Sequence, residues 1–139
     1  MAREEQITRH RILIVDDEES TRLLLARMLS ADLEADVQLA GTSEQAIKLL
    51  ENYAYDAILL DLMMPGIGGL AILKDIRSAP PNDATPVVVV SSVSDPKMVE
   101  ECLAAGASAY HVKPVRRAEL IATVKKLIAA RRAPAKAKK

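Results

Sequence analysis

The chain of 139 residues has no tryptophan, no phenylalanine and a single cysteine. A hydrophobic core must therefore come from aliphatic side chains, which supply most of the 50% of residues that are hydrophobic. One cysteine, Cys102, cannot form an internal disulfide, which argues against a disulfide-stapled fold. The two histidines, His10 and His111, have no cysteine or histidine neighbours at ligand spacing, so no zinc site is expected.

Long apolar segments are also absent. No run approaches the roughly 18 residues that a membrane helix needs, and the polar start MAREEQITRHR lacks the apolar part of a secretory signal. A cytoplasmic protein without a membrane partner is therefore predicted. No acid follows Glu119, although seven lysines and arginines do. A net-negative body with a basic end is not typical of a specific nucleic-acid binder. We interpret residues 132–139 as a basic disordered tail and residues 1–10 as an N-terminal extension.

Segments of strand length alternate with segments of helical period along the rest of the chain. Strands are expected at 11–15, 37–40, 57–60, 87–90 and 109–112, and helices at 20–33, 43–52, 70–78, 96–105 and 117–131. Three of the strand segments are continuous apolar runs, which are typical of strands buried on both faces of a parallel sheet. Five βα units in succession predict one α/β domain with a doubly wound parallel sheet.

Two local features of the helices can be predicted from the same segments. The helix at 20–33 is expected to place Leu24, Met28 and Leu29 on its buried face. Thr42 and Asp95 stand directly before helical segments, where their side chains can cap the first turn.

Polar residues follow four of the five predicted strands at the carboxyl end. They are Asp16, Asp17, Asp61, Ser91, Ser92 and Lys113. Because these ends share one edge of a doubly wound sheet, the side chains should meet in one crevice. Acids at a helix start can complement the helix dipole, but that does not explain Asp16 and Asp17, which directly follow a buried strand. Carboxylates brought together repel unless a cation compensates, and oxygen ligands in an open site suit Mg²⁺.

The acidic loop DDEES argues against other uses of this architecture. It would repel phosphate without a metal, and the chain has no G-x-G-x-x-G, no P-loop and no G-x-S-x-G motif. A Mg²⁺-dependent phosphohydrolase would use similar acids. Such enzymes usually carry a second acid two residues after the nucleophile as general acid, and Met63 stands there.

Four segments in order, ILIVDDEES, LLDLMMPGIGG, PVVVVSS and AGASAYHVKPV, resemble the receiver domain of two-component response regulators. The resemblance covers residues 11–131. It implies a flavodoxin-like (βα)5 fold with a five-stranded parallel sheet in the strand order 2-1-3-4-5.

The resemblance also implies a phosphoryl site. Asp61 occupies the position of the aspartate that accepts the phosphoryl group. Asp16 and Asp17 match the acidic pair that holds Mg²⁺ together with Asp61, and the backbone carbonyl of Met63 is implied as a further ligand.

Three more roles follow from the resemblance. Lys113 matches the lysine that pairs with the phosphoryl group, and its bond to Pro114 is expected to be cis. Ser91, rather than the adjacent Ser92, matches the hydroxyl that contacts the phosphoryl group. Tyr110 matches the aromatic switch residue.

The function implied is that of a phosphoacceptor signalling module, and not of a metabolic enzyme. Its donor would be a sensor histidine kinase or a histidine phosphotransfer protein. A downstream protein, or a second copy in a weak dimer, would bind the face formed by 96–105, 109–112 and 117–131. A phosphorelay intermediate, a piece of a longer regulator, a scaffold that never accepts phosphate and a phosphohydrolase are the alternatives. Met63 and Val93 are apolar where a polar side chain could orient water, which predicts slow self-dephosphorylation.

Overall fold

The computed structural model describes residues 9–132. Strands and helices alternate through this range. The strands are β1 (His10–Val15), β2 (Ala35–Ala40), β3 (Ala57–Leu60), β4 (Val87–Ser91) and β5 (Ala109–Val112). The helices are α1 (Glu19–Leu33), α2 (Ser43–Asn52), α3 (Gly69–Ser78), α4 (Pro96–Ala104) and α5 (Arg117–Arg132).

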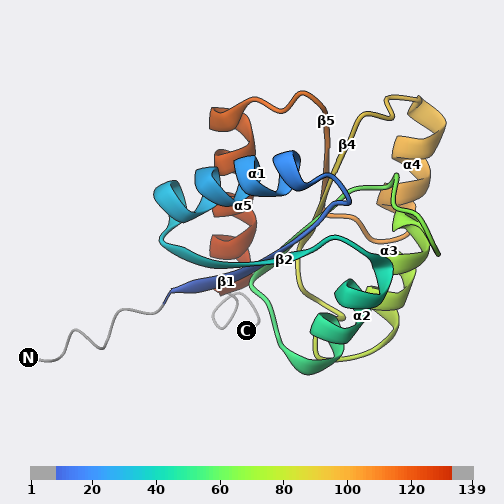
Figure 1. The fold of residues 1–139 in the computed structure, drawn as a ribbon, viewed down its shortest axis with the longest axis horizontal. Helices are drawn as coiled ribbons and strands as arrows, with labels where there is room; N and C mark the ends of the chain where they lie inside the picture. The colour runs from blue at the N-terminus through green and yellow to red at the C-terminus, as the bar shows by residue number, and fades with distance from the viewer. Residues whose placement is uncertain (1–8, 133–139) are drawn as a thin grey trace, which may run out of the picture.

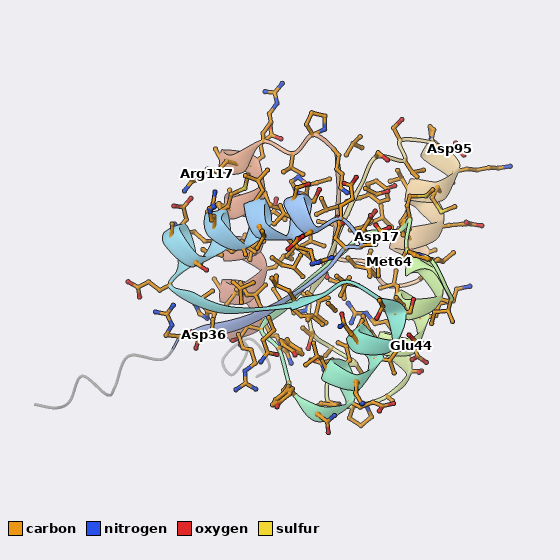
Figure 2. All side chains as sticks on the ribbon, in the orientation of Figure 1. Asp17, Asp36, Glu44, Met64, Asp95 and Arg117 are labelled. Carbon is orange, nitrogen blue, oxygen red and sulfur yellow. The ribbon has the colours of Figure 1, made fainter. Side chains whose placement is uncertain are left out.

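All five strands pair in parallel in the order β2-β1-β3-β4-β5. Figure 1 shows the sheet between two layers, with α1 and α5 on one face and α2, α3 and α4 on the other. This confirms the predicted doubly wound fold and its strand order. At the surface, Arg117 of α5, labelled in Figure 2, donates two 3.0 Å hydrogen bonds to Asp32 of α1.

The sheet separates two hydrophobic cores. In β1, Leu13 and Val15 face the core under α2, α3 and α4, whereas Ile12 and Ile14 face the core under α1 and α5. The inner strands β3 and β4 are buried along their whole length. Both cores are aliphatic, with Cys102 fully buried in the first. The continuous apolar runs of the inner strands follow from this burial on both faces.

The bounds of β3, β5 and α2 are those predicted, and most others differ by one residue at one end. The larger difference is at β2, which begins at Ala35, two residues before the predicted start. Glu34 adopts a left-handed conformation with φ of 51°, so the chain reverses directly after α1. Ala35 then pairs at once with His10 of β1.

The predicted buried face of α1 is wrong in one residue. Leu24 is 52% exposed, whereas Leu25, Met28, Leu29 and Leu33 are buried. These four residues have spacings of three, four and eight positions from Leu25, which form one stripe along a helix. Leu24 precedes that stripe by one residue and therefore points about 100° away from it.

The predicted caps are present. The Thr42 hydroxyl accepts a hydrogen bond from the Gln45 N–H at 3.1 Å, and Asp95 accepts one from the Lys97 N–H at 3.2 Å. The Gln45 side chain, however, binds the N–H of Gly41 at 2.8 Å. In a complete capping box it would instead bind the N–H of the cap residue itself.

Candidate functional site

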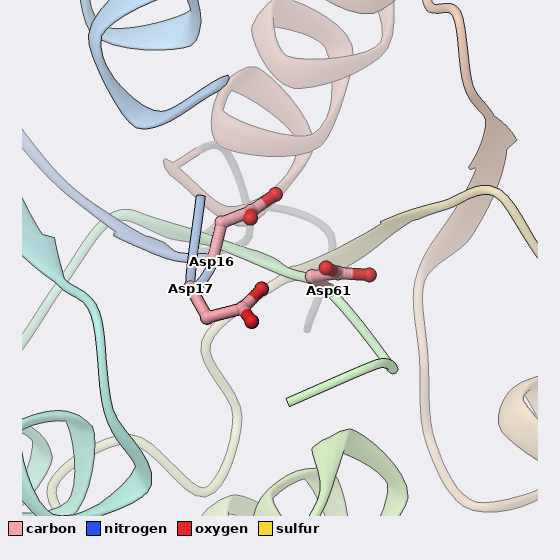
Figure 3. Close-up of side chains that lie close together, drawn as sticks. All are labelled: Asp16, Asp17 and Asp61. Carbon is pink, nitrogen blue, oxygen red and sulfur yellow. The ribbon is translucent and has the colours of Figure 1, made fainter. Parts of the chain in front are cut away.

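The backbone holds Asp16 and Asp61 at the carboxyl edge of the sheet. The N–H of Asp61 donates to the Val15 carbonyl at 2.9 Å, and the N–H of Asp16 donates to the Ala40 carbonyl at 3.1 Å. Each acid thus extends a strand ladder by one residue beyond its strand. Figure 3 shows the side chains of Asp16 and Asp17 next to that of Asp61.

The three acids form a cluster that fits a hard cation. Carboxylate oxygens of Asp16, Asp17 and Asp61 lie within 4.8 Å of one another. Asp16 and Asp61 are 2% and 4% exposed, whereas Asp17 is exposed. Within residues 9–132, these three carboxylates have one ammonium beside them and so carry excess negative charge, and their oxygens are the ligand type that Mg²⁺ prefers. The sequence prediction that these acids meet is confirmed.

Lys113 is the ammonium at this cluster. Its Nζ lies 2.9 Å from Asp16 Oδ2 and 3.5 Å from Asp61 Oδ2. Its N–H donates to the Ser91 carbonyl at 2.8 Å, so the end of β4 fixes its backbone. Partial burial disfavours the ammonium, but the hydrogen bond to Asp16 and the charges of Asp61 and Asp16 raise the pKa of Lys113 above its ordinary value. The peptide bond from Lys113 to Pro114 is cis, as predicted.

The environment of Asp61 works against its negative charge. Burial raises the pKa of this carboxyl group, and the neighbouring Asp16 adds to the increase. The N–H of Met63, which donates to Asp61 Oδ1 at 3.2 Å, and the ammonium of Lys113 lower the pKa in part. A further positive charge at this site would therefore stabilise the ionised form.

Ser91 and Tyr110 meet at the same backbone segment. Ser91 is fully buried, and its hydroxyl accepts a hydrogen bond from the Val93 N–H at 3.1 Å. The Tyr110 hydroxyl donates to the Val93 carbonyl at 2.5 Å. Ser92 is exposed. The structure thus places Ser91, and not Ser92, on the inner side of the crevice and links it to Tyr110 through one residue.

The loop after Asp61 lets the backbone pass close to the acid. A side chain on Gly69 would place its Cβ 2.5 Å from the Asp61 carbonyl oxygen. Gly66 and Gly68 have φ values of 89° and 83°, which favour glycine. Met63 is 60% exposed on this loop. The loop therefore runs close beside Asp61, which is itself buried.

Arg22 contacts the site but was not predicted. It projects from the first turns of α1, and its Nη1 donates to the backbone carbonyl of Asp16 at 2.8 Å. Arginine six residues after an acid is not by itself a recognisable signal. The glycine at position 41, which the guanidinium approaches closely, is the one hint that the sequence offers.

With this geometry in place, comparison with known proteins identifies the family. Residues 12–125 match the family model of the response regulator receiver domain. The chain belongs to the response regulator receiver domain family.

Relatives and solved structures agree with this assignment. The chain is 38% identical over 116 residues to the sensory/regulatory protein RpfC of Xanthomonas campestris, covering 82% of this chain and 16% of RpfC. It is 36% identical over 129 residues to the response regulator ArlR of Staphylococcus saprophyticus, covering 91% and 54%. The chain thus spans about half the length, or less, of these relatives.

Among solved structures, the receiver domain of the sensor histidine kinase PA1611 from Pseudomonas aeruginosa matches with a TM-score of 0.80 and 29% identity. The match covers 88% of this chain and 99% of that one, and that structure has a magnesium ion coordinated in its active-site cleft.

The function class follows from the family. The chain is a receiver domain of two-component systems, a signalling module and not a classical enzyme, and such domains partner with histidine kinases. This confirms the predicted family and function class. Across residues 9–132, no helix combines the length and apolarity needed to cross a membrane.

Proposed function

We propose that Asp61 is the phosphoacceptor of this receiver domain. One observation carries the proposal: Asp61 is a buried carboxylate with the Lys113 ammonium at 3.5 Å and two further carboxylates within 4.8 Å. The end of β3 delivers this side chain to the crevice, and the glycine-containing loop after it runs close beside it. Helix capping alone would not require those neighbours.

The proposed transfer uses the side chains of this site. An oxygen of Asp61 attacks the phosphorus of a phosphohistidine on a sensor histidine kinase or a histidine phosphotransfer protein. The phosphorus–nitrogen bond breaks, the imidazole leaves with the electron pair and takes up a proton, and an acyl phosphate forms on Asp61. The Lys113 ammonium then pairs with a phosphoryl oxygen. The same chemistry with a small phosphodonor amounts to self-phosphorylation.

Mg²⁺ is the proposed cofactor. Asp16, Asp17, Asp61 and the backbone carbonyl of Met63 would hold it. When bound, it would supply positive charge against the phosphoryl oxygens. The magnesium ion in the PA1611 receiver domain and the oxygen cluster in this chain support the assignment.

Ser91 and Tyr110 are the proposed switch. A phosphoryl group on Asp61 offers the Ser91 hydroxyl a charged acceptor for its own proton, and turning towards that acceptor would move the hydroxyl away from the Val93 N–H, from which it accepts at present. Because the Tyr110 hydroxyl binds the carbonyl of the same residue, moving this segment alters what holds Tyr110. The change would appear on the face of α4, β5 and α5, where Leu103 and Val112 are 47% and 43% exposed. This face would bind a downstream protein, or a second copy weakly, in the cytoplasm.

The alternatives differ in what they require of the site. A phosphorelay intermediate or a piece of a longer regulator would use the same site, and the partial coverage of the relatives is compatible with both. A phosphohydrolase of this kind usually carries a second acid two residues after the nucleophile as general acid. Met63 stands in that position and is not an acid.

The test is phosphorylation by a small acyl phosphate in the presence of Mg²⁺, followed by intact mass spectrometry. We expect one phosphoryl group per chain, none with EDTA and none in Asp61→Asn. Asp75→Asn, an exposed acid on α3, is the matched control and should be phosphorylated like the wild type. Phosphorylation that persists in Asp61→Asn would overturn the assignment.

A further inference from the structure

The β1–β2 ladder ends in an unusual way next to the acid cluster. Val15 pairs with Ala40, and the N–H of Asp16 donates to the Ala40 carbonyl. In a parallel ladder, the carbonyl of Asp16 would next accept from the N–H of residue 42. The chain instead turns into α2, with Thr42 as its cap. The Arg22 Nη1, at 2.8 Å from the Asp16 carbonyl oxygen, takes the place of that missing donor.

Gly41 provides the space for this guanidinium. A Cβ atom at position 41 would lie 2.6 Å from Arg22 Nη1 and 3.1 Å from its Cζ. Unlike Gly66 and Gly68, Gly41 does not have a positive φ, so its backbone conformation does not require glycine. Its role is to leave room for Arg22. Because an arginine tip is flexible, an alanine here would displace the guanidinium and leave the backbone in place.

The hydrogen bond from Arg22 matters because it is made to the peptide group that joins Asp16 to Asp17. The Asp16 carboxylate is held directly, by the Glu18 N–H at 2.9 Å and by Lys113 at 2.9 Å. The Asp17 carboxylate is exposed and accepts no hydrogen bond from residues 9–132. Its direction therefore depends on the peptide that joins it to Asp16. The carbonyl of that peptide is the group that Arg22 holds.

We propose that Arg22 is a positioning residue of the metal site, which fixes the Asp16–Asp17 peptide so that the Asp17 carboxylate faces Asp61, with Gly41 leaving the space for it. The inference rests on the proposed function, since it names the support of the proposed Mg²⁺ ligands. Arg22 itself contacts the Asp16 backbone carbonyl. Residues that hydrogen-bond to metal ligands orient those ligands in other metal sites, and Arg22 would act in the same way.

Charge and position make opposite predictions for Arg22, which makes the inference testable. A cation near the cluster repels Mg²⁺, so loss of charge alone would tighten Mg²⁺ binding. Loss of positioning would weaken it, typically 10- to 100-fold for partners of metal ligands. The direction of the change thus separates the two roles.

The experiment measures the Mg²⁺ dissociation constant of the full chain by isothermal titration calorimetry, at fixed pH and ionic strength. We expect Arg22→Met to weaken binding about 10-fold or more. Gly41→Ala should weaken it in the same direction, and the double variant no further than Arg22→Met alone, because both changes remove one contact. Arg27→Met, which removes an exposed arginine from the same helix, should bind as the wild type does or slightly tighter.

Two further measurements separate positioning from general destabilisation. Urea unfolding in EDTA measures the free energy of unfolding of each variant without metal. The calorimetry is done under conditions in which each variant is folded, far below its unfolding midpoint. The maximal phosphorylation rate at saturating Mg²⁺ should stay near the wild-type value, while the Mg²⁺ concentration for half-maximal rate rises.

The contradicting results are distinct. Wild-type or tighter Mg²⁺ binding by Arg22→Met would overturn the positioning role. Fully additive losses in the double variant would overturn the link to Gly41. If the wild type itself bound no Mg²⁺, the proposed metal site would fail, and the role of Arg22 with it.

Discussion

Removing the charge of Asp61 should stabilise the metal-free fold. Asp61 is 4% exposed and lies within 4.8 Å of the carboxylate oxygens of Asp16 and Asp17. Asparagine has nearly the same shape and can keep the hydrogen bond from the Met63 N–H. Asp61→Asn thus isolates the effect of the charge.

The size of the effect follows from the distances. At an effective dielectric constant of about 20, a carboxylate at 4.8 Å, the largest separation in the cluster, repels Asp61 by roughly 3.5 kcal/mol, and a nearer one repels it more. The exposed Asp17 is screened to less than half of that. The Lys113 ammonium at 3.5 Å offsets about 4.7 kcal/mol. The repulsion from Asp16 and Asp17 and the attraction to Lys113 nearly cancel. The cost of burying the Asp61 charge remains. We therefore expect the free energy of unfolding to rise by about 1–3 kcal/mol in the variant.

The gain should depend on pH with a defined sign. Burial raises the pKa of Asp61 in the folded chain above its ordinary value of 3.8. Below 3.8 the group is protonated in both the folded and the unfolded chain, so it carries no penalty. The penalty develops as the pH rises through the interval between 3.8 and the raised pKa, and is complete above it. The advantage of Asp61→Asn should therefore be full above the raised pKa and shrink as the pH falls towards 3.8.

Urea unfolding followed by circular dichroism, in EDTA, measures the difference. Asp75→Asn on the exposed side of α3 is the control and should stay within about 0.5 kcal/mol of the wild type. If Asp61→Asn were no more stable than the wild type at pH 7, or if its gain did not shrink on acidification, the ionised Asp61 carboxylate would not destabilise the metal-free fold.

Three further predictions concern the metal, the phosphoryl lifetime and the core. Mg²⁺ at about 100 times its dissociation constant should stabilise the wild type by about 2.7 kcal/mol in urea unfolding, and Asp17→Asn should lose most of this gain; a wild type indifferent to Mg²⁺ would contradict the site. Intact mass measured over time should show slow loss of the phosphoryl group, accelerated at least about threefold by Met63→Gln or Val93→Gln, or about 0.65 kcal/mol of barrier; fast loss unchanged by both variants would refute the role of these apolar side chains. Leu120→Ala, at a fully buried position, should cost about 2–5 kcal/mol, and Leu24→Ala far less because Leu24 is half exposed; equal losses would place Leu24 in the core.

The inner strands and the residues that follow them could be predicted because burial on both faces leaves a plain signal. The runs ILIV, AILL and VVVV are continuous because β1, β3 and β4 have a layer of helices on each side. Asp16 and Asp61 follow directly from those runs. The edge strands are only partly buried, so their composition is mixed, and β2 began two residues earlier than its apolar residues indicate.

The contacts of Arg22 and Asn82 could not be predicted. Arg22 reaches back to a carbonyl six residues earlier, and nothing in the periodicity of α1 distinguishes it from Arg27. Asn82 stands in the segment SAPPNDATP, which has the composition of an exposed turn. It is nevertheless 2% exposed, and its side chain binds the N–H of Tyr55 and the carbonyls of Leu50 and Tyr53. Such bonds depend on which segments the fold brings together.

The most direct test of the central claim is to locate the phosphoryl group within the chain. After phosphorylation with a small acyl phosphate and Mg²⁺, borohydride reduction converts an acyl-phosphorylated aspartate to homoserine, which peptide mass spectrometry can place. We predict homoserine at position 61, and none in the sample treated with EDTA. Homoserine at position 16 or 17 instead, or a chain phosphorylated with no change at position 61, would contradict it.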